Sequence, residues 1–265
     1  MPATPFDENY YRLGCGRPYQ REPHWLRFFG GVADELVRRL GPRSVLDAGC
    51  AMGFLVEALR ERGVDAEGVD ISEYAISQVR ADVRAYCRVG SILDPFPRRY
   101  DLVTCIEVLE HLPPAEAARA VANLCAAADD IVFSSSPSDY AEQTHFNVQP
   151  PEYWAELFAL NGFVRDLDFD GLFLTPWAVR FRRSAEPAHR LVRAYERRFA
   201  QLWKENTDLR AALGAARQEL SETTQSPSWA LARALQTTRQ RLAPDGSRRA
   251  RWLDGVLRRL RPPQA

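Results

Sequence analysis

The chain has 265 residues, of which 46% are hydrophobic and 26% are charged, and its formal net charge at pH 7 is zero. A chain of this length buries one full-sized core and leaves residues for an appendage, and the charge balance argues against a nucleic-acid partner. No apolar run approaches the roughly 20 residues that cross a bilayer, so we expect no membrane-spanning helix. The five cysteines, an odd number with no C-x-x-C pair, are typical of reduced thiols and predict a cytoplasmic protein.

Apolar periodicity predicts an α/β fold over most of the chain. Residues 1–24 form an aromatic and arginine-rich segment that we expect to cap a pocket, and an amphipathic helix follows at 25–40. Segments with strand and helix periods then alternate. Strands are predicted at 44–46, 66–69, 85–89, 100–106, 130–134, 163–169 and 172–181, and helices at 53–62, 71–83, 115–127 and 151–161. This alternation predicts a parallel sheet with helices on both faces, closed by an antiparallel edge strand.

The stretch SVLDAGCAMG, residues 44–53, joins the first strand to the next helix. Dinucleotide-binding proteins place G-x-G-x-x-G at such a turn, so that backbone amides approach a pyrophosphate. Only Gly49 and Gly53 remain of that pattern, and Asp47 ends the strand, which suits a ligand with cationic groups. Asp70 ends the second strand about 20 residues further on, where an acidic side chain binds the two hydroxyls of a ribose.

Three motifs, VLDAGCAMG, GVDIS and YDLVTCIEVLEHL, together resemble the class I S-adenosylmethionine-dependent methyltransferases. The resemblance covers residues 25–181 and implies a Rossmann-like, seven-stranded methyltransferase sheet with S-adenosylmethionine as cofactor. Many relatives have Asp at the position of Ser91, so the expected contact with the adenine amine differs here. The residues that the resemblance assigns to cofactor binding are Asp47, Gly49, Cys50, Gly53, Asp70, Ile71, Ser91 and Ile92.

Candidate catalytic residues follow the fourth and fifth strands. Methyl transfer from a sulfonium requires an aligned nucleophile and, for a hydroxyl acceptor, a base that removes its proton. Glu107 and His111 follow the fourth strand and His145 follows the fifth, and these loops meet above the carboxyl ends of a parallel sheet. The alternative is that Glu107 and His111 only cap the loop and the first turn after the strand.

A metal site is a further alternative for the same loops. The E-x-x-E-H arrangement resembles the divalent-metal site of small-RNA 2′-O-methyltransferases and, in part, that of ubiquinone-biosynthesis O-methyltransferases. A divalent metal there would lower the pKa of a substrate hydroxyl. Its ligands would be Glu107, Glu110, His111 and His145.

From these patterns we expect an O-methyltransferase that acts on a sugar or glycan intermediate. Tyr10, Tyr11, Arg12 and Tyr19 precede the sheet and suit stacking on, and hydrogen bonding to, a sugar ring. The chain also resembles methyltransferases of bacterial surface-glycan assembly. The alternatives are a metal-assisted O-methyltransferase of a small phenol or an RNA 2′-hydroxyl, and a catalytically silent assembly scaffold.

We place the methyltransferase domain at residues 25–183. Beyond it, the sequence predicts a coiled coil at 186–222 and a basic helical tail at 226–265. Apolar residues three and four apart form a heptad seam. One Asn in that seam favours a parallel homodimer, the alternative being a helix folded back on the enzyme. The basic tail predicts peripheral membrane contact. The seam residues are Val192, Tyr195, Phe199, Leu202, Asn206, Leu209, Leu213, Ala216 and Leu220.

Overall fold

The computed structural model describes residues 5–252. The described residues fall into two compact units that divide after Leu191. The first unit contains a seven-stranded sheet in the order β3-β2-β1-β4-β5-β7-β6. Its strands are β1 (Ser44–Ala48), β2 (Asp65–Asp70), β3 (Cys87–Val89), β4 (Leu102–Ile106), β5 (Asp130–Ser134), β6 (Phe163–Arg165) and β7 (Val179–Arg183).

The pairing within the sheet is parallel from β3 to β5 and antiparallel beyond it. β1 pairs in parallel with β2 and β4, and β7 runs antiparallel between β5 and the edge strand β6. The α/β sheet with antiparallel pairing at one edge, predicted from the sequence, is confirmed. All parallel strands end at one edge, so the loops after β1, β2, β4 and β5 lie at neighbouring positions, which is where open α/β sheets bind ligands.

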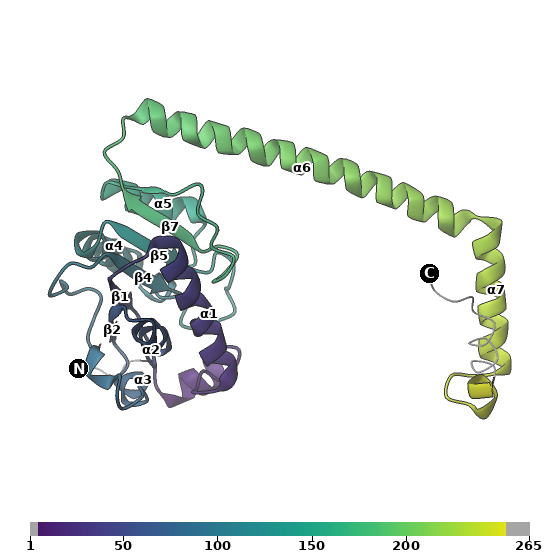
Figure 1. The fold of residues 1–265 in the computed structure, drawn as a ribbon, viewed down its shortest axis with the longest axis horizontal. Coiled ribbons are helices and arrows are strands. Elements are labelled where there is room, and N and C mark those ends of the chain that lie inside the picture. The colour runs from purple at the N-terminus through teal and green to yellow at the C-terminus, as the bar shows by residue number, and fades with distance from the viewer. Residues whose placement is uncertain (1–4, 253–265) are drawn as a thin grey trace. The chain divides into compact units, whose positions relative to one another are not determined.

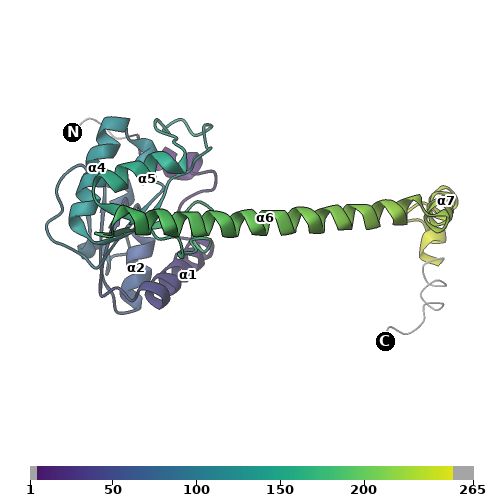
Figure 2. The ribbon, with the colours of Figure 1, turned by 90° about the horizontal axis from the view of Figure 1, so that it is seen from above.

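Helices cover both faces of the sheet. Figure 2 shows α1 and α2 on one side and α4 and α5 on the other. The helices and helical turns of this unit are η1 (Tyr10–Gly14), α1 (Pro23–Leu40), α2 (Phe54–Glu61), α3 (Glu73–Ser77), η2 (Arg84–Tyr86), η3 (Leu109–His111), α4 (Pro114–Ala127) and α5 (Pro151–Leu160) (Figure 1). The apolar core is therefore divided into two layers. Leu36, Leu55 and Leu59 are buried in one layer, and Leu124 and Phe158 are buried in the other.

The predicted helix over 71–83 is wrong beyond its first turns. α3 ends at Ser77, and the chain then forms turns up to η2. The Arg84 guanidinium donates to the carbonyl oxygens of Ser77 and Val79, which satisfies backbone acceptors that a longer helix would have used internally. The strand predicted at 85–89 is also shorter than expected. η2 occupies its first residues, and β3 begins only at Cys87.

The boundaries predicted for the last two strands are also wrong. The strand predicted at 163–169 ends at Arg165, and the one predicted at 172–181 starts only at Val179. The apolar residues between them fold into turns, where the rings of Phe169 and Phe173 meet edge to face with 5.9 Å between centroids. The apolar residues of this loop therefore gave the same sequence pattern as the apolar residues of a strand.

The second unit is helical. The predicted helical extension is confirmed: α6 (Ala188–Gln225) is followed by α7 (Pro227–Leu242), and Ser226 caps the second helix by accepting a hydrogen bond from the Trp229 amide at 3.2 Å. Among residues 5–252, no helix is both long and apolar enough to cross a membrane. Most of the predicted amphipathic face of the tail, residues 253–260, lies outside the described residues.

Candidate active site

The loop after β1 requires glycine at two positions. Gly49 has φ of +92°, and a Cβ atom there would lie 2.3 Å from Cγ2 of Val108. Gly53 has φ of +69° and precedes α2, where a Cβ atom would lie 3.0 Å from Sγ of Cys87. Both conformations are left-handed and are strained for residues with a side chain. The small residues of this loop therefore let it pack closely under the loop that follows β4.

Asp47 ends β1 as a buried carboxylate. Its Oδ1 accepts a hydrogen bond of 2.7 Å from the hydroxyl of Thr104, the residue opposite it in β4. Burial raises the pKa of Asp47 to about 7, and the Thr104 hydrogen bond opposes that rise. Because no cation offsets this burial among the ion pairs of the described residues, a cationic ligand would stabilise the ionised form.

Asp70 ends β2 and joins two loops. Its Oδ2 accepts from the amide of Ala51 at 2.8 Å, and its Oδ1 accepts from the amide of Ser72 at 2.8 Å. Burial raises the pKa of Asp70, and these two hydrogen bonds oppose the rise. Each carboxylate oxygen has a second lone pair, so Asp70 can still accept hydrogen bonds from the two hydroxyls of a ribose.

The other predicted cofactor-binding residues differ in how accessible their side chains are to a ligand. Ile71 has 40% of its surface exposed, which is unusual for a large apolar residue beside a buried carboxylate. Cys50 is buried under β2. Ser91 lies at the surface and its hydroxyl accepts from the amide of Leu93. The side chain of Ile92 packs in the apolar core on the α4 side, so only its backbone is available to a ligand.

These residues fit S-adenosylmethionine chemically. The cofactor carries a sulfonium and an α-ammonium, and Asp47 and Asp70 are two buried carboxylates without a cationic partner in the described chain. Gly49 allows the loop backbone to pack against Val108, and Ile71 presents an exposed apolar side chain next to Asp70. Asp47, Gly49, Asp70 and Ile71 are therefore the residues that would hold the cofactor.

The N-terminal segment lies against these loops. The Ser72 hydroxyl donates to the carbonyl oxygen of Phe6 at 2.6 Å. The rings of Tyr11 and Tyr74 stack with 6.0 Å between centroids, and the rings of Tyr19 and Phe54 lie 5.2 Å apart. Arg12, by contrast, is exposed and donates to the side-chain oxygen of Asn9 at 3.2 Å. The segment thus covers the region of Asp70, and its opening and closing remain a prediction.

His111 and His145 lie together, as predicted from their strand-end positions. Their rings meet edge to face with 4.7 Å between centroids. Nδ1 of His145 lies 2.8 Å from the carbonyl oxygen of Asp139, and Nδ1 of His111 lies 3.1 Å from that of Thr144. A carbonyl only accepts, so each Nδ1 carries the proton and each Nε2 has a lone pair. Burial lowers the pKa of His111 to about 4, and the neighbouring His145 lowers it further.

Glu107 and Glu110 are held by other partners. Glu107, at φ of +53°, accepts from Nε1 of Trp177 at 2.9 Å. Glu110 is fully buried, and its Oε1 accepts from the amide of Ser136 at 3.3 Å. Among residues 5–252, no three His, Cys, Asp or Glu side chains lie close enough together to hold a metal ion. The structure therefore does not bring Glu107, Glu110, His111 and His145 together as the alternative metal site required.

Sequence reasoning missed several residues of this region. Thr104 bonds Asp47, Trp177 bonds Glu107, and Thr144 contacts His111. The threonine within the otherwise apolar run LVTCI was the one available signal. In addition, buried polar atoms at the ends of β4 and β5 have no hydrogen-bond partner in the described chain, and water or a bound acceptor would satisfy them. They are Oε2 of Glu110, Oγ of Ser134, Oγ of Ser135 and Nδ2 of Asn147.

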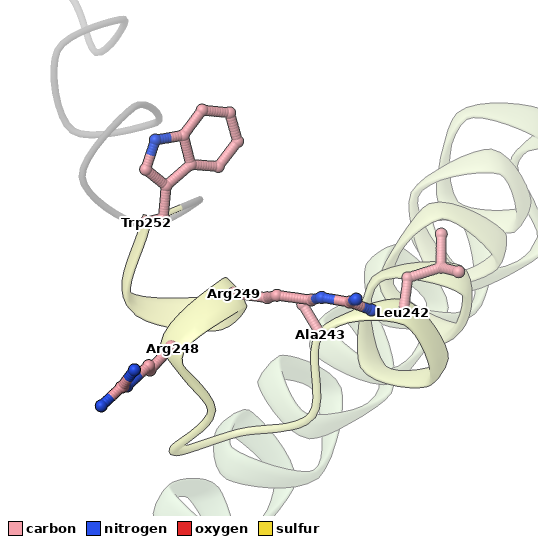
Figure 3. Close-up of a pocket in the computed structure, with 5 residues that line it drawn as sticks. All are labelled: Leu242, Ala243, Arg248, Arg249 and Trp252. Atoms are coloured by element: carbon pink, nitrogen blue, oxygen red, sulfur yellow. The ribbon is translucent and has the colours of Figure 1, made fainter.

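Two cavities lie away from this region. One of about 440 Å³ belongs to the second unit, where Arg249 extends toward Leu242 at the end of α7 (Figure 3). Its lining contains two arginines and no carboxylate, so it offers no acceptor for ribose hydroxyls. The residues that line it are Leu242, Ala243, Arg248, Arg249 and Trp252. Another of about 220 Å³ lies near Phe96 and Ala127, at the amino ends of β4 and β5, opposite the candidate site.

Solved methyltransferases share the fold. The chain matches magnesium protoporphyrin IX methyltransferase from Synechocystis PCC 6803 with bound SAH at 20% identity and a TM-score of 0.50, covering 69% of this chain and 90% of that one. It also matches the PH0226 protein from Pyrococcus horikoshii OT3 at 18% identity and a TM-score of 0.53, covering 68% of this chain and all of that one.

Curated relatives correct the expected acceptor. The chain is 32% identical over 120 residues to a ubiquinone biosynthesis O-methyltransferase of Nitrosomonas europaea, covering 40% of this chain and 51% of the relative. It is 36% identical over 125 residues to one of Neisseria meningitidis serogroup C, covering 43% and 50%. The matches span about half the length of these relatives. The prediction of a sugar or glycan acceptor is wrong, since these relatives belong to a quinone pathway. The prediction rested on the side chains of Tyr10, Tyr11, Arg12 and Tyr19, which suit many ring-shaped acceptors and do not identify one.

The family assignment follows from a match to a family model. A sequence model described as "Methyltransferase domain" matches residues 24–166, which is more than half of the 265 residues. That range contains the glycine loop, both buried aspartates and both histidines of the site. The chain belongs to this methyltransferase family, the class I fold that uses S-adenosylmethionine.

Proposed function

We propose that this chain transfers a methyl group from S-adenosylmethionine to a hydroxyl oxygen on an aromatic ring, in an intermediate of a quinone pathway. Support comes from the curated relatives, which are ubiquinone biosynthesis O-methyltransferases. The acceptor is inferred from the relatives together with the side chains that surround the two histidines.

The observation that carries the proposal is the state of His145. Its Nδ1 donates to the Asp139 carbonyl at 2.8 Å, which leaves a lone pair on Nε2. Only 8% of its side chain is exposed, so the ring is held in place and removed from bulk water. A neutral imidazole in a fixed tautomer is the usual general base of enzymes. We assign that role to His145.

The surroundings of the histidine pair favour a planar aromatic acceptor. The ring of Phe6 lies 5.3 Å from that of His111, and the ring of Tyr10 lies 6.2 Å from it, both edge to face. Aromatic rings pack on one another in this geometry. Since the pKa of His111 is lowered to about 4, the ring is neutral at pH 7 and repels no cation on the cofactor.

The chemistry is a displacement at carbon. The bound cofactor supplies an activated methyl group on a sulfonium. The acceptor oxygen would take this methyl group, and the electron pair of the sulfur–methyl bond would remain on sulfur as S-adenosylhomocysteine. Nε2 of His145 receives the hydroxyl proton, while Asp47 and Asp70 orient the cofactor. His111 supports the ring of His145 through the 4.7 Å ring contact.

Transfer of labelled methyl groups from S-adenosylmethionine to phenolic quinone precursors tests the proposal. With such an acceptor, His145→Ala is expected to lower kcat by roughly 10² to 10⁴ while cofactor affinity is retained. The exposed histidine His24 on α1 provides the matched control, His24→Ala, which should behave as wild type. Absence of transfer to any phenolic acceptor, or full activity of His145→Ala, would overturn the proposal.

A further inference from the structure

The helix α6 buries none of its own side chains. It extends over 38 residues, from Ala188 to Gln225, and none of them is buried. At 1.5 Å per residue it is about 57 Å long. Most helices in proteins are stabilised by the packing of one face rather than by intrinsic propensity. A helix of this length with every residue accessible therefore indicates a missing partner along its length.

Its apolar residues form one seam with a seven-residue repeat. Taking Val192 as position a, the a positions are Val192, Phe199, Asn206, Leu213 and Leu220, and the d positions are Tyr195, Leu202, Leu209 and Ala216. Phe199 and Leu209, for example, are 69% and 70% exposed. A repeat of 3.5 residues maintained over four heptads is the pattern of a coiled-coil interface.

We propose that the partner is a second copy of this chain, and that two α6 helices form a parallel, in-register coiled coil. Asn206 is the one polar residue among the a and d positions up to Leu220. In a parallel pair an a residue faces the same residue of the other copy, so the two Asn206 amides bond each other. In an antiparallel pair Asn206 would face an apolar d residue and would be buried without a partner, which destabilises that arrangement.

Side chains flanking the seam favour the same orientation. In a parallel dimer a g residue faces the e residue five positions on in the other helix. Glu205 at g then faces Arg210, which forms an attractive ion pair, and Arg198 at g faces the exposed indole of Trp203, which suits a cation–π contact. The further g residue Glu219 faces a threonine. No like charges oppose each other along the described helix.

The opposite side of α6 already has its own polar pairs. Lys204 Nζ lies 2.6 Å from the Oδ2 atom of Asp208, and Gln218 donates to Glu222 at 2.9 Å. These residues occupy positions c and f, which point to solvent in a two-stranded coil. The polar pairs stabilise the outer face of the helix and leave the seam as the unpartnered surface.

Disulfide formation within the full-length chain tests both the partner and the orientation. Phe199→Cys and Leu213→Cys lie one heptad on either side of Asn206, and each should cross-link to its own copy under mild oxidation if the helices are parallel and in register. Lys204→Cys, at the outer position f, is the matched control and should not cross-link. The wild-type chain gives the background from its own cysteines, four of which are buried.

The oligomeric mass provides an independent measurement. Light scattering of the full-length protein at tens of micromolar should give twice the chain mass of 30.1 kDa. Asn206→Leu should raise the melting temperature and admit larger assemblies, because the amide pair no longer restricts the coil to two strands. A mass of one or three chains overturns the proposal. So does a result in which Phe199→Cys cross-links to Leu209→Cys and not to its own copy, because a residue at position a faces a residue at position d only in an antiparallel dimer.

Discussion

At the scale of single residues, the candidate site is defined by buried carboxyl groups with altered pKa values. Asp47 and Asp70 lie at the ends of adjacent strands, and burial raises the pKa of both. Neither has a cationic partner among the ion pairs of the described chain, which is costly for an isolated protein. A bound cofactor would offset that cost, because its cationic groups would pair with Asp47 and its ribose hydroxyls would donate to Asp70.

Removal of the Asp70 carboxylate tests the cofactor site. Asp70→Ala should weaken S-adenosylmethionine binding about tenfold to a hundredfold, because charge-assisted hydrogen bonds to the ribose contribute ~1.5 to 3 kcal/mol. Asp101→Ala is the matched control: Asp101 also accepts two backbone amides, from Arg43 and Ser44, but at the opposite edge of the sheet. Titration calorimetry that gives equal dissociation constants for the two variants would contradict the assignment.

Glu110 should make folding stability depend on pH. Burial, aided by the charge of Glu107, raises its pKa to about 8 from 4.5. A carboxyl group with a raised folded-state pKa stabilises the protein fully below its unfolded pKa, and that contribution is lost as pH rises toward 8. Glu110→Gln removes this titration. The free energy of unfolding of Glu110→Gln, compared with that of the wild type, should therefore increase as pH rises from about 5 to 8.

Urea unfolding at several pH values measures this difference. Glu116→Gln, the same substitution at an exposed position of α4, controls for the chemical change alone. A gap between wild type and Glu110→Gln that stays constant from pH 5 to 8 would show that Glu110 is already ionised in the folded protein.

At the scale of helices and strands, the apolar pattern of the sequence predicts whether a segment is a helix or a strand better than it predicts where that segment ends. β5 was predicted at its observed bounds because it is a central strand whose apolar run, Ile131 to Phe133, is buried. α3 and β6 were predicted too long. Tertiary contacts end them: Arg84 caps the carbonyls beyond α3, and Phe169 turns into the core instead of continuing β6. Side-chain contacts that the apolar pattern does not encode thus accompany the ends of these elements.

At the scale of the whole molecule, the chain combines a catalytic unit with a helical one. The contacts of both aspartates and both histidines lie within the first unit, and the final sheet contact is the Ser184 amide bound to the Gly162 carbonyl at 3.0 Å. The helix α6 begins only at Ala188. All residues assigned to cofactor binding therefore belong to the first unit.

Truncation after Pro187 should separate the two properties. The shortened chain is expected to bind S-adenosylmethionine with an unchanged dissociation constant and to behave as a monomer in light scattering. A chain ending at Asp166 is the comparison: it lacks β7, whose Phe181 ring stacks on Phe158 with 4.1 Å between centroids, and should not fold. Loss of cofactor affinity in the longer truncation would mean that the helical unit contributes to the site.

The sequence by itself determined the alternation of strands and helices, the small-residue loop around Gly49 and the heptad seam of α6. These features depend on the local periodicity of apolar residues and on the size of each residue. Residues that are neighbours in the sequence specify both. Only the tertiary structure decided the insertion of β7 between β5 and β6, the meeting of His111 with His145, and the cover of Phe6 and Tyr11 over the cofactor loops. Each joins segments far apart in the chain, and their proximity depends on strand order and loop packing, which no local pattern encodes.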